Sequence, residues 1–349
     1  MSFPTYLGNS AFWKTFFTPD RYSYDKIPDL SGKVAIVTGA NAGIGYAITV
    51  GLASRGAHVI MACRSESKCT KAMAEIRDEI KAKFPDAPKD VQLEFLELDL
   101  NDLNKVKAAA ETFLSRGLPL HILINNAGIM GTPWRLSADG IEEQFAVNYL
   151  ATFVFTMGLL DKLKESQPSR IVLVNSVGHE MSVSGGINID RINDESEGHP
   201  SARYGRSKFA SMLFMKSLTR RLASEQIYVN SAHPGIVDTE MCRHSADAYG
   251  CFLTQIMRLT AKTVAYTPAK GALTPLYCAT SPEIEEKAEK DSDVSGIRGK
   301  FFIPIANELR PSKLTESVEL QEKVWAYTEK LISEKLNKKY DFSTLMAAV

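Results

Sequence analysis

The sequence predicts an α/β protein in which one parallel sheet is covered by helices on both faces. Three observations support this. Short β-branched runs alternate with longer helical stretches, the runs are apolar along most of their length, and no linker divides the chain. Apolar strands of this kind occur in parallel sheets that are buried on both faces. Because the crossovers between such strands are right-handed, the expected architecture is a three-layer, doubly wound sheet in a single domain.

Six strands are expected, and each of the first five is followed by a helical segment. They are, in chain order, 34–38 (VAIVT), 58–62 (HVIMA), 92–98 (QLEFLEL), 121–125 (HILIN), 170–176 (RIVLVNS) and 227–233 (IYVNSAH). The helix after the third strand has a start signal, because Asn101 and Asp102 are residue types that cap helices. We expect 31–305 to form the domain, with an N-terminal extension over 1–30 and a C-terminal amphipathic helix and tail over 306–349.

The composition argues against several classes of protein. The 349 residues carry 41 basic and 41 acidic side chains, so the formal charge of zero gives no electrostatic reason to expect a nucleic acid as partner. Five cysteines without a CxxC motif indicate a reduced intracellular protein with no disulfide framework. Six histidines without an HExxH motif or a cluster with cysteine give no reason to expect a metal.

The N-terminal extension is aromatic but lacks a continuous apolar run, so it fits neither a signal peptide nor a membrane span. Its side chains Phe12, Trp13, Phe16 and Phe17 have two interpretations: they pack on the domain, or they contact a membrane surface. We therefore expect a cytoplasmic protein, with a peripheral position on a membrane as the alternative that follows from the second interpretation.

Chemistry is expected beyond the carboxyl ends of the strands, where a doubly wound sheet of the Rossmann type binds its ligands. The first such place holds TGANAGIG, residues 38–45. Its glycines permit a sharp turn and let a ligand and the following helix approach the backbone. The free N–H groups at the start of that helix then point at an anion, so the loop predicts a pyrophosphate cradle for a dinucleotide. The expected contacts come from Gly39, Asn41, Gly43, Ile44 and Gly45.

The second strand indicates which dinucleotide binds. Where an NAD-dependent protein usually carries an acidic residue for the ribose hydroxyls, this chain has Cys63 followed by Arg64. A guanidinium neutralises a 2′-phosphate, and the missing carboxylate removes a repulsion, so NADP(H) is the expected cofactor. The alternative is that Arg64 is merely solvated at the end of the strand.

The next two strand ends have a structural interpretation beside the functional one. Asp99, followed by Leu100, can accept a hydrogen bond from the adenine amino group, or it can cap the next helix. In the NNAG sequence at 125–128, Asn126 and Ala127 leave room for a cofactor to lie against the sheet. The asparagine amides there can equally satisfy backbone groups at the strand end.

A set of motifs in a fixed order carries a family resemblance. The motifs are TGANAGIG, Asp99, NNAG, Asn148, Ser176, YGRSK (204–208) and HPGIVDT (233–239). In this order they resemble the short-chain dehydrogenase/reductase family over about 30–305. The resemblance is closer to the retinol-dehydrogenase-like and chloroplast-envelope-type reductases. These share the ACR strand end, the INNAGIM run, an insertion before the tyrosine helix and a late aromatic helix like LQEKVWAYTEKL.

The resemblance implies hydride transfer between a nicotinamide and a carbonyl carbon, with Tyr204 as the general acid/base. A tyrosine alone has a pKa of about 10, but Lys208 lies four positions later on the same helix face, and its charge lowers that pKa. Lys208 would also hold the nicotinamide ribose, while Ser176 would hydrogen-bond the substrate oxygen. The family usually shows two serines here, whereas this chain has Asn175 before Ser176. Ala151 stands where the family often has glycine, with little expected effect.

The resemblance gives roles to five further residues. Asn148 would anchor a water that links the active site to solvent. Thr239 would hold the nicotinamide carboxamide, with Pro234 and Gly235 setting the turn before it and Val237 as a further cofactor contact. These roles depend on the resemblance, because a proline–glycine pair alone indicates only a turn.

Two segments beside the expected cleft bear on the class of substrate. Residues 240–266 follow the nicotinamide contact and are expected to fold over the cleft as a lid, and the insertion at 178–203 would help to shape its mouth. The apolar content of the lid favours a retinoid, a steroid-like ketone or a long-chain aldehyde, although the same side chains would also serve only to pack the lid down. A preference for NADPH in a reducing cytosol favours carbonyl reduction.

Three functions stay open at this point. The first is an NADP(H)-dependent oxidoreductase acting on a small lipophilic carbonyl or alcohol, and the presence of the tyrosine, lysine and serine together favours it. The second is an NADPH-binding scaffold or redox sensor with little turnover. The third is a reductase recruited to a membrane surface by its aromatic N-terminus. The oligomeric state stays open too, because the added termini could cover the helices through which members of the resembled family pair.

Overall fold

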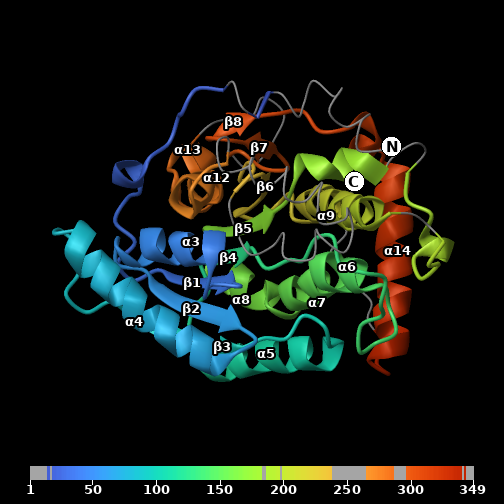
Figure 1. Ribbon diagram of the computed structural model, residues 1–349, viewed down its shortest axis with the longest axis horizontal. Coiled ribbons are helices and arrows are strands. Elements are labelled where there is room, and N and C mark those ends of the chain that lie inside the picture. The colour runs from blue at the N-terminus through green and yellow to red at the C-terminus, as the bar shows by residue number, and fades with distance from the viewer. Residues whose placement is uncertain are drawn as a thin grey trace, which may run out of the picture.

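The computed structural model describes residues 14–15, 18–182, 186–196, 199–237, 265–286, 296–339 and 342. Eight strands in this part of the chain form one sheet in the order β3-β2-β1-β4-β5-β6-β7-β8 (Figure 1). They are β1 Val34–Thr38, β2 His58–Cys63, β3 Leu93–Glu97, β4 Ile122–Asn125, β5 Ser169–Val174, β6 Ile227–Ala232, β7 Phe301–Ile303 and β8 Asn307–Glu308. All neighbours are parallel except β7 and β8. The strand order reverses between β1 and β4, and the cleft of a doubly wound sheet lies at that reversal.

The six expected strands are confirmed, with their ends within two residues of the expected positions. The structure corrects the expectation that 227–233 closes the series, because β7 pairs in parallel with β6 and β8 returns antiparallel to β7. The sheet therefore continues past residue 305. Neither strand has a pattern that a sequence can reveal, since β7 is a run of three residues and β8 consists of one asparagine and one glutamate.

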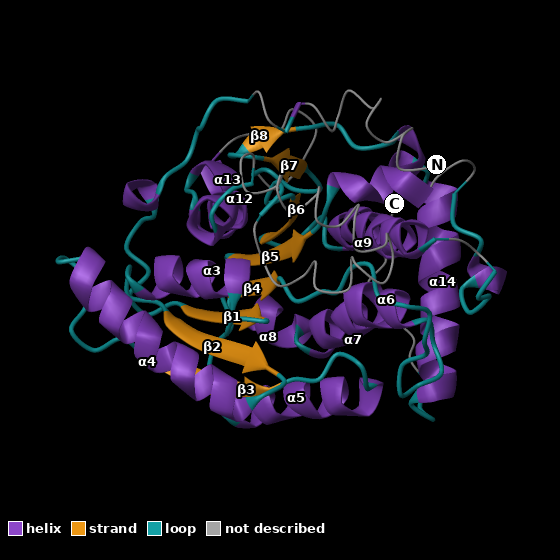
Figure 2. Cartoon of the chain, viewed as in Figure 1, coloured by secondary structure: helices purple, strands orange, loops and turns teal. Residues whose placement is uncertain are grey.

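Helices cover both faces of the sheet (Figure 2). One face carries α3 Gly43–Ala53, α4 Glu66–Lys83 and α12 Pro268–Thr280, and the other carries α5 Leu103–Ser115, α7 Ala151–Gly158 and α9 Pro200–Arg221. The alternation of β1 separates the two cores: Ala35 and Val37 pack with the first group, whereas Val34 and Ile36 pack with the second. The shorter elements are α6 Glu143–Phe145, η2 Ala146–Leu150, α8 Leu160–Glu165, α13 Glu283–Glu286, η1 Tyr24–Lys26, η3 Val177–Ser182, η4 Ile189–Arg191 and η6 Lys313–Glu316.

The predicted cap of the helix after the third strand is present. The Asp102 carboxylate accepts hydrogen bonds from the backbone N–H groups of Asn104 and Lys105, at 2.9 and 3.3 Å, and α5 begins at the next residue. These bonds satisfy N–H groups that have no partner inside the helix. The cap fixes α5 directly below the carboxyl end of β3, where Asp99 lies.

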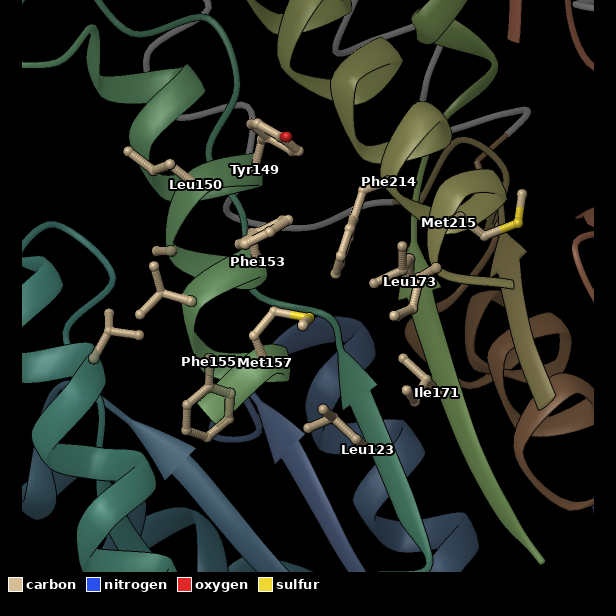
Figure 3. Close-up of a cluster of buried hydrophobic side chains, with 14 of the residues drawn as sticks. Leu123, Tyr149, Leu150, Phe153, Phe155, Met157, Ile171, Leu173, Phe214 and Met215 are labelled. Carbon is tan, nitrogen blue, oxygen red and sulfur yellow. The ribbon is translucent and has the colours of Figure 1, made fainter. Parts of the chain in front are cut away.

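The expected C-terminal helix is α14, Val318–Lys335, and it packs against α9. The centroid of the Trp325 ring lies 5.0 Å from that of Phe153 and 6.0 Å from that of Phe214. Figure 3 shows Phe153 and Phe214 facing each other above the sheet. The Arg221 guanidinium lies 3.9 Å over the Trp325 ring and makes two hydrogen bonds to Glu322, at 2.8 and 2.6 Å. The helix α9 is thus held between the sheet and α14 by apolar, cation–π and charge-assisted contacts.

The described part of the N-terminal extension follows the side of the domain. Tyr22 is buried and its hydroxyl lies 2.7 Å from the Thr280 hydroxyl, while the Asn307 amide donates to the Pro19 oxygen at 2.8 Å. The aromatic positions 12, 13, 16 and 17, whose packing or membrane contact was left open, lie outside the described residues. In the described part of the chain, no helix has the combination of length and apolarity that crossing a bilayer requires.

Candidate active site

The loop between β1 and α3 has the shape of an anion cradle. Gly39 and Gly43 have φ values of +66° and +56°, which other residues adopt only with strain. A β-carbon at Gly45 would lie 2.2 Å from the Gly39 oxygen and 2.6 Å from the Asn126 amide nitrogen, so only glycine fits. Ala42, before the first turn of α3, supplies no side-chain cap, and this turn contains no acidic residue. Its N–H groups therefore fit a pyrophosphate.

Asn126 anchors the start of the β1–α3 loop through hydrogen bonds to Thr38. Its side-chain amide donates to the Thr38 oxygen at 2.9 Å, and the Thr38 hydroxyl accepts the N–H groups of Asn126 and Ala127 at the same distance. The Asn126 side chain thus satisfies a backbone group at the strand end, and its predicted contact with the cofactor stays a prediction. Ala127 lies on the open side, where it lines a cavity.

A cavity of about 340 Å³ lies beyond the carboxyl ends of β1 to β4. Six of the predicted cofactor contacts line it: Gly39, Asn41, Arg64, Asp99, Leu100 and Ala127. Gly43, Ile44 and Gly45 are set back in α3, where Ile44 is buried, so the structure brings them to the cradle but not to the cavity wall. The predicted residues from four strand ends thus converge on one place, as the topology requires.

The end of β2 presents a cation without a competing carboxylate. Arg64 is exposed at the edge of the cavity and has no ion-pair partner among the residues that the structure describes. Cys63 is buried, and its thiol is hydrogen-bonded to that of Cys69 and to the backbone N–H groups of Ala40 and Asn41. The hydrogen bond with Cys69 contributes most, and together these contacts hold the pKa of the Cys63 thiol below its usual range. A guanidinium at this place can form charge-assisted hydrogen bonds with an anionic group of a ligand.

The Asp99 carboxylate, just after β3, is bound by residues close to it in the sequence. One oxygen accepts the N–H of Asn101 at 3.1 Å, and the other lies 3.7 Å from the Lys105 ammonium. Because Asp102 caps α5, the alternative role of Asp99 as the helix cap is wrong. Asp99 remains at the cavity wall beside Leu100.

The cavity also contains polar residues that the sequence did not point to. Thr132 is 1% exposed, and its hydroxyl has no hydrogen-bond partner among the described residues. Arg135 and Glu143 form an ion pair at 2.6 Å on the same wall. These residues come from the loop after β4 and the start of α6. No motif marks them, because their position depends on the path of the loop between 129 and 142.

The predicted acid/base pair lies on α9. Tyr204 and Lys208 are 6% and 5% exposed, and the Lys208 ammonium lies 5.8 Å from the centroid of the Tyr204 ring. Lys208 Nζ donates to the Val174 oxygen at 2.9 Å, at the end of β5. Burial lowers the pKa of Lys208 from 10.5 to about 8, because the charged form loses hydration. A β-carbon on Gly128, in the cavity wall, would be 3.7 Å from Lys208 Nζ, so the ammonium of Lys208 lies just behind this wall.

Asn148 lies in the π-helical turn η2, which interrupts the expected long helix after β4. Its oxygen accepts the Ile129 N–H at 2.8 Å, and its amide donates to the Ile129 oxygen and the Ser207 hydroxyl, both at 2.9 Å. The side chain thus ties the strand-end loop to α9 next to Lys208. Short π-helical turns inside α-helices are frequent at functional sites. The sequence gives no sign of this π-helical turn.

Ser176 follows β5 and is half-buried. Its hydroxyl oxygen accepts the Gly178 N–H at 3.0 Å, so the hydroxyl proton is left for another acceptor. Its carbonyl oxygen lies 2.7 Å from Nδ1 of His179, a fully buried ring. Burial lowers the pKa of His179 to about 4, which keeps this imidazole neutral at physiological pH.

The turn after β6 is shaped by Gly235, which has a φ of +88°. A β-carbon there would meet the Tyr266 ring at 2.7 Å, so this ring lies directly on the turn. Val237 pairs with Tyr266, whose N–H donates to the Ile236 oxygen at 2.7 Å. Ile236 and Val237, which precede the segment predicted as a lid, are therefore joined to Tyr266, its last residue. Thr239 and the predicted lid, apart from its last two residues, lie outside the described residues.

The insertion before Tyr204 is anchored at both of its sides. Arg206 donates to the backbone oxygens of Arg191 and Ile192, at 3.1 and 2.7 Å. Asn193 accepts the Glu142 N–H at 2.8 Å and donates to the Gly140 oxygen at 2.8 Å. The described part of the insertion is thus fixed between α9 and the start of α6.

Comparison with known proteins gives a consistent result. The family model described as short chain dehydrogenase matches residues 33–250. Human retinol dehydrogenase 14 is 37% identical over 309 residues, which cover 87% of each chain. The chloroplastic short-chain dehydrogenase TIC 32 B of Brassica napus is 36% identical over 311 residues, or 87% of this chain and 90% of that protein. A variant of actinorhodin polyketide ketoreductase, solved with NADPH, superimposes with a TM-score of 0.56 at 25% identity, covering 74% of this chain and 91% of that one.

Proposed function

Because the chain belongs to the short-chain dehydrogenase family, we propose that it is an NADP(H)-dependent oxidoreductase acting on a lipophilic carbonyl or the corresponding alcohol. The observation that supports this most directly is the position of Lys208. Its ammonium is hydrogen-bonded to the Val174 oxygen and lies 5.8 Å from the Tyr204 ring, at the border of a glycine-lined cavity. A buried cation beside a tyrosine favours the phenolate that remains after proton donation.

Three side chains act in the proposed reaction. The dinucleotide supplies a hydride when it is bound. Tyr204 donates a proton to the oxygen of the carbonyl group as that oxygen gains charge. Ser176 keeps its proton and donates a hydrogen bond from its hydroxyl to the same oxygen, while its own hydroxyl oxygen accepts the Gly178 N–H. Lys208 stabilises the tyrosinate and holds the nicotinamide ribose.

The cofactor preference follows from the end of β2. The exposed Arg64 guanidinium can form charge-assisted hydrogen bonds with a 2′-phosphate, and the buried Cys63 leaves no carboxylate that would repel it. Thr132 and the ion pair of Arg135 with Glu143 line the same cavity as Arg64. A ketoreductase of similar fold was solved with NADPH, which agrees with this preference.

The lipophilic substrate class rests on two arguments. The relatives include a retinol dehydrogenase, and the sequence over 240–266 is rich in apolar residues next to the expected nicotinamide contact. The direction favoured is carbonyl reduction with NADPH.

The test is a comparison of carbonyl compounds as electron acceptors. Purified chain is mixed with NADPH and all-trans-retinal, a steroid ketone, decanal or a water-soluble sugar aldehyde, and the loss of NADPH absorbance is followed. We expect at least one of the three lipophilic compounds to be reduced with a kcat/KM at least about tenfold above that of the sugar, because apolar surface contributes binding energy in proportion to its area. Equal or exclusive use of the sugar aldehyde would contradict the substrate class, and no consumption with any carbonyl would contradict the proposed activity.

The rate of carbonyl reduction is expected to fall above pH 8. Burial lowers the pKa of Lys208 to about 8, so its charge is almost fully present at pH 6 to 7 and is lost as the pH rises through 8. Without the charge, the tyrosinate loses its stabilising partner, and kcat/KM for NADPH should drop by about tenfold per pH unit. In Lys208→Arg the guanidinium keeps its charge, so its lower rate should not fall in this range. A flat profile of the wild-type chain between pH 7 and 9.5 would contradict the role of Lys208.

A further inference from the structure

Asn175 connects the two elements that carry the proposed catalytic residues. It is 2% exposed and directly precedes Ser176 at the end of β5. Its side-chain oxygen accepts the Ser176 N–H at 2.8 Å, and its side-chain nitrogen donates to the Lys208 carbonyl oxygen at 3.2 Å. One amide group thus spans from the strand-end loop to α9.

Lys208 is therefore tied to the end of β5 twice. Its ammonium donates to the Val174 oxygen at 2.9 Å, and its carbonyl oxygen accepts from Asn175, the next residue. The backbone of Asn175 is itself fixed, because its N–H donates to the Ala232 oxygen at 2.8 Å and its carbonyl group is hydrogen-bonded to the buried ring of His233. The amide cannot shift without breaking bonds on both of its sides.

We propose that Asn175 is a positioning residue that sets the location of Ser176 relative to Lys208, and through α9 relative to Tyr204. The proposal rests on the proposed function. Asn175 does not need to touch the substrate or the cofactor. It acts by holding the Ser176 N–H with one atom and the Lys208 main chain with the other, so that the serine hydroxyl and the tyrosine–lysine pair meet at one oxygen atom of the substrate.

Only an amide of this length meets both requirements. A carboxylate can accept the Ser176 N–H, but it has no proton for the Lys208 oxygen, and its charge would be buried. A serine, which the resembled family usually has here, carries its hydroxyl directly on Cβ, one bond short of the amide nitrogen. An alanine satisfies neither group. The asparagine is thus a departure from the usual pattern that adds a connection between β5 and α9.

Asn230 offers a matched control. It is fully buried in β6, and its amide makes the same two types of bond: its nitrogen donates to the Ile297 oxygen at 2.8 Å, and its oxygen accepts the Lys300 N–H at 3.0 Å. These bonds join β6 to the segment before β7 and do not involve Ser176 or α9. The change Asn230→Ser therefore removes a comparable pair of buried bonds outside the proposed site.

The experiment compares Asn175→Ser, Asn175→Asp and Asn230→Ser with the wild-type chain. The melting temperature and the Kd for NADPH, from the change in its fluorescence, report folding and cofactor binding. Steady-state kinetics use the carbonyl of the panel above that the wild-type chain reduces fastest. We expect kcat of Asn175→Ser to fall at least about tenfold with KM for the carbonyl nearly unchanged, because misplacement of a reacting group acts on the chemical step. The kcat of Asn230→Ser should stay within about twofold of the wild-type value, even if its melting temperature falls as much as that of Asn175→Ser.

The pH profile supplies a readout that a loss of stability alone would not move. Release of the Lys208 main chain lets water reach its ammonium, so the basic limb of kcat/KM for NADPH should shift upward by about half a pH unit or more in Asn175→Ser. Asn175→Asp keeps the acceptor for Ser176 and loses the donor for Lys208, so it tests the same connection should the serine variant not fold. The proposal is overturned if the folded Asn175 variants match Asn230→Ser in kcat and in the pH profile. If the wild-type chain itself reduces no carbonyl, the proposed function fails first, and this proposal fails with it.

Discussion

Replacing Tyr204 with phenylalanine should lower kcat for carbonyl reduction by about 10³-fold, because proton transfer by a positioned side chain contributes about 10²- to 10⁴-fold. The ring is 6% exposed and would stay in place, so the change removes the hydroxyl and little else. Lys208 and the cavity wall are unchanged, and the Kd for NADPH should remain within about twofold. The measurement is the loss of NADPH absorbance with the best carbonyl of the panel, together with a fluorescence titration of NADPH.

Tyr149→Phe is the control for this experiment. Tyr149 is also buried, and its hydroxyl lies 2.6 Å from the Thr328 hydroxyl, on the side of α14. Its loss removes one buried hydroxyl of the same kind from a place without a proposed chemical role. We expect the control to keep its kcat while its melting temperature falls by a few degrees. A Tyr204→Phe variant that retains a tenth or more of the wild-type kcat would refute the role of Tyr204 as proton donor.

Reversing the charge of Arg64 should change the preference between the two nicotinamide cofactors. In Arg64→Glu the charge-assisted hydrogen bonds to the 2′-phosphate are lost, and such bonds contribute about 1.5–3 kcal/mol each. The Kd for NADPH should therefore rise about 10- to 100-fold. The Kd for NADH should fall or stay the same, because the new carboxylate can accept from the ribose hydroxyls in the place where NAD-dependent proteins carry an acidic residue.

A second charge reversal, at a residue that does not line the cavity, separates this local effect from the general field of the protein. Lys71 on α4 is 79% exposed and pairs only weakly with Glu75, at 3.7 Å. Lys71→Glu makes the same change in net charge, but it should leave the ratio of the two Kd values within about twofold, since exposed charges are screened. A ratio that stays constant in Arg64→Glu, or that changes equally in both variants, would rule out a specific contact between Arg64 and the phosphate.

The sequence predicts much of the fold because six of the strands are short segments rich in apolar residues that alternate with longer helical segments. Such runs have few other stable placements than the middle of a sheet. β7 and β8 escape prediction because their pairing depends on long-range contacts: Phe301 meets Ser231, and Glu308 meets Phe302. Neither strand is long enough for a period of two to be visible.

The candidate site divides in the same way. Gly39, Arg64 and Lys208 can be found from the sequence because their positions at strand ends or on one helix face follow from local rules. Thr132 and Glu143 cannot be found, since only the path of the loop after β4 brings them to the cavity. The bridge made by Asn175 is also invisible in the sequence, because it depends on the distance between β5 and α9. Local chemistry is written in the sequence, whereas the connections between elements appear only once the chain has folded.

The pairing of Val237 with Tyr266 has a consequence for how new substrate specificities can arise. Because Val237 and Tyr266 are paired and the Tyr266 ring rests on Gly235, the residues between them enter and leave the scaffold at one fixed point. Since β6 ends at Ala232, before either anchor, insertions or deletions within that stretch are expected to leave the register of β6 unchanged. A chimera that exchanges residues 240–265 for the corresponding stretch of a relative keeps Thr239, so it should retain its cofactor machinery and acquire a different range of ligands.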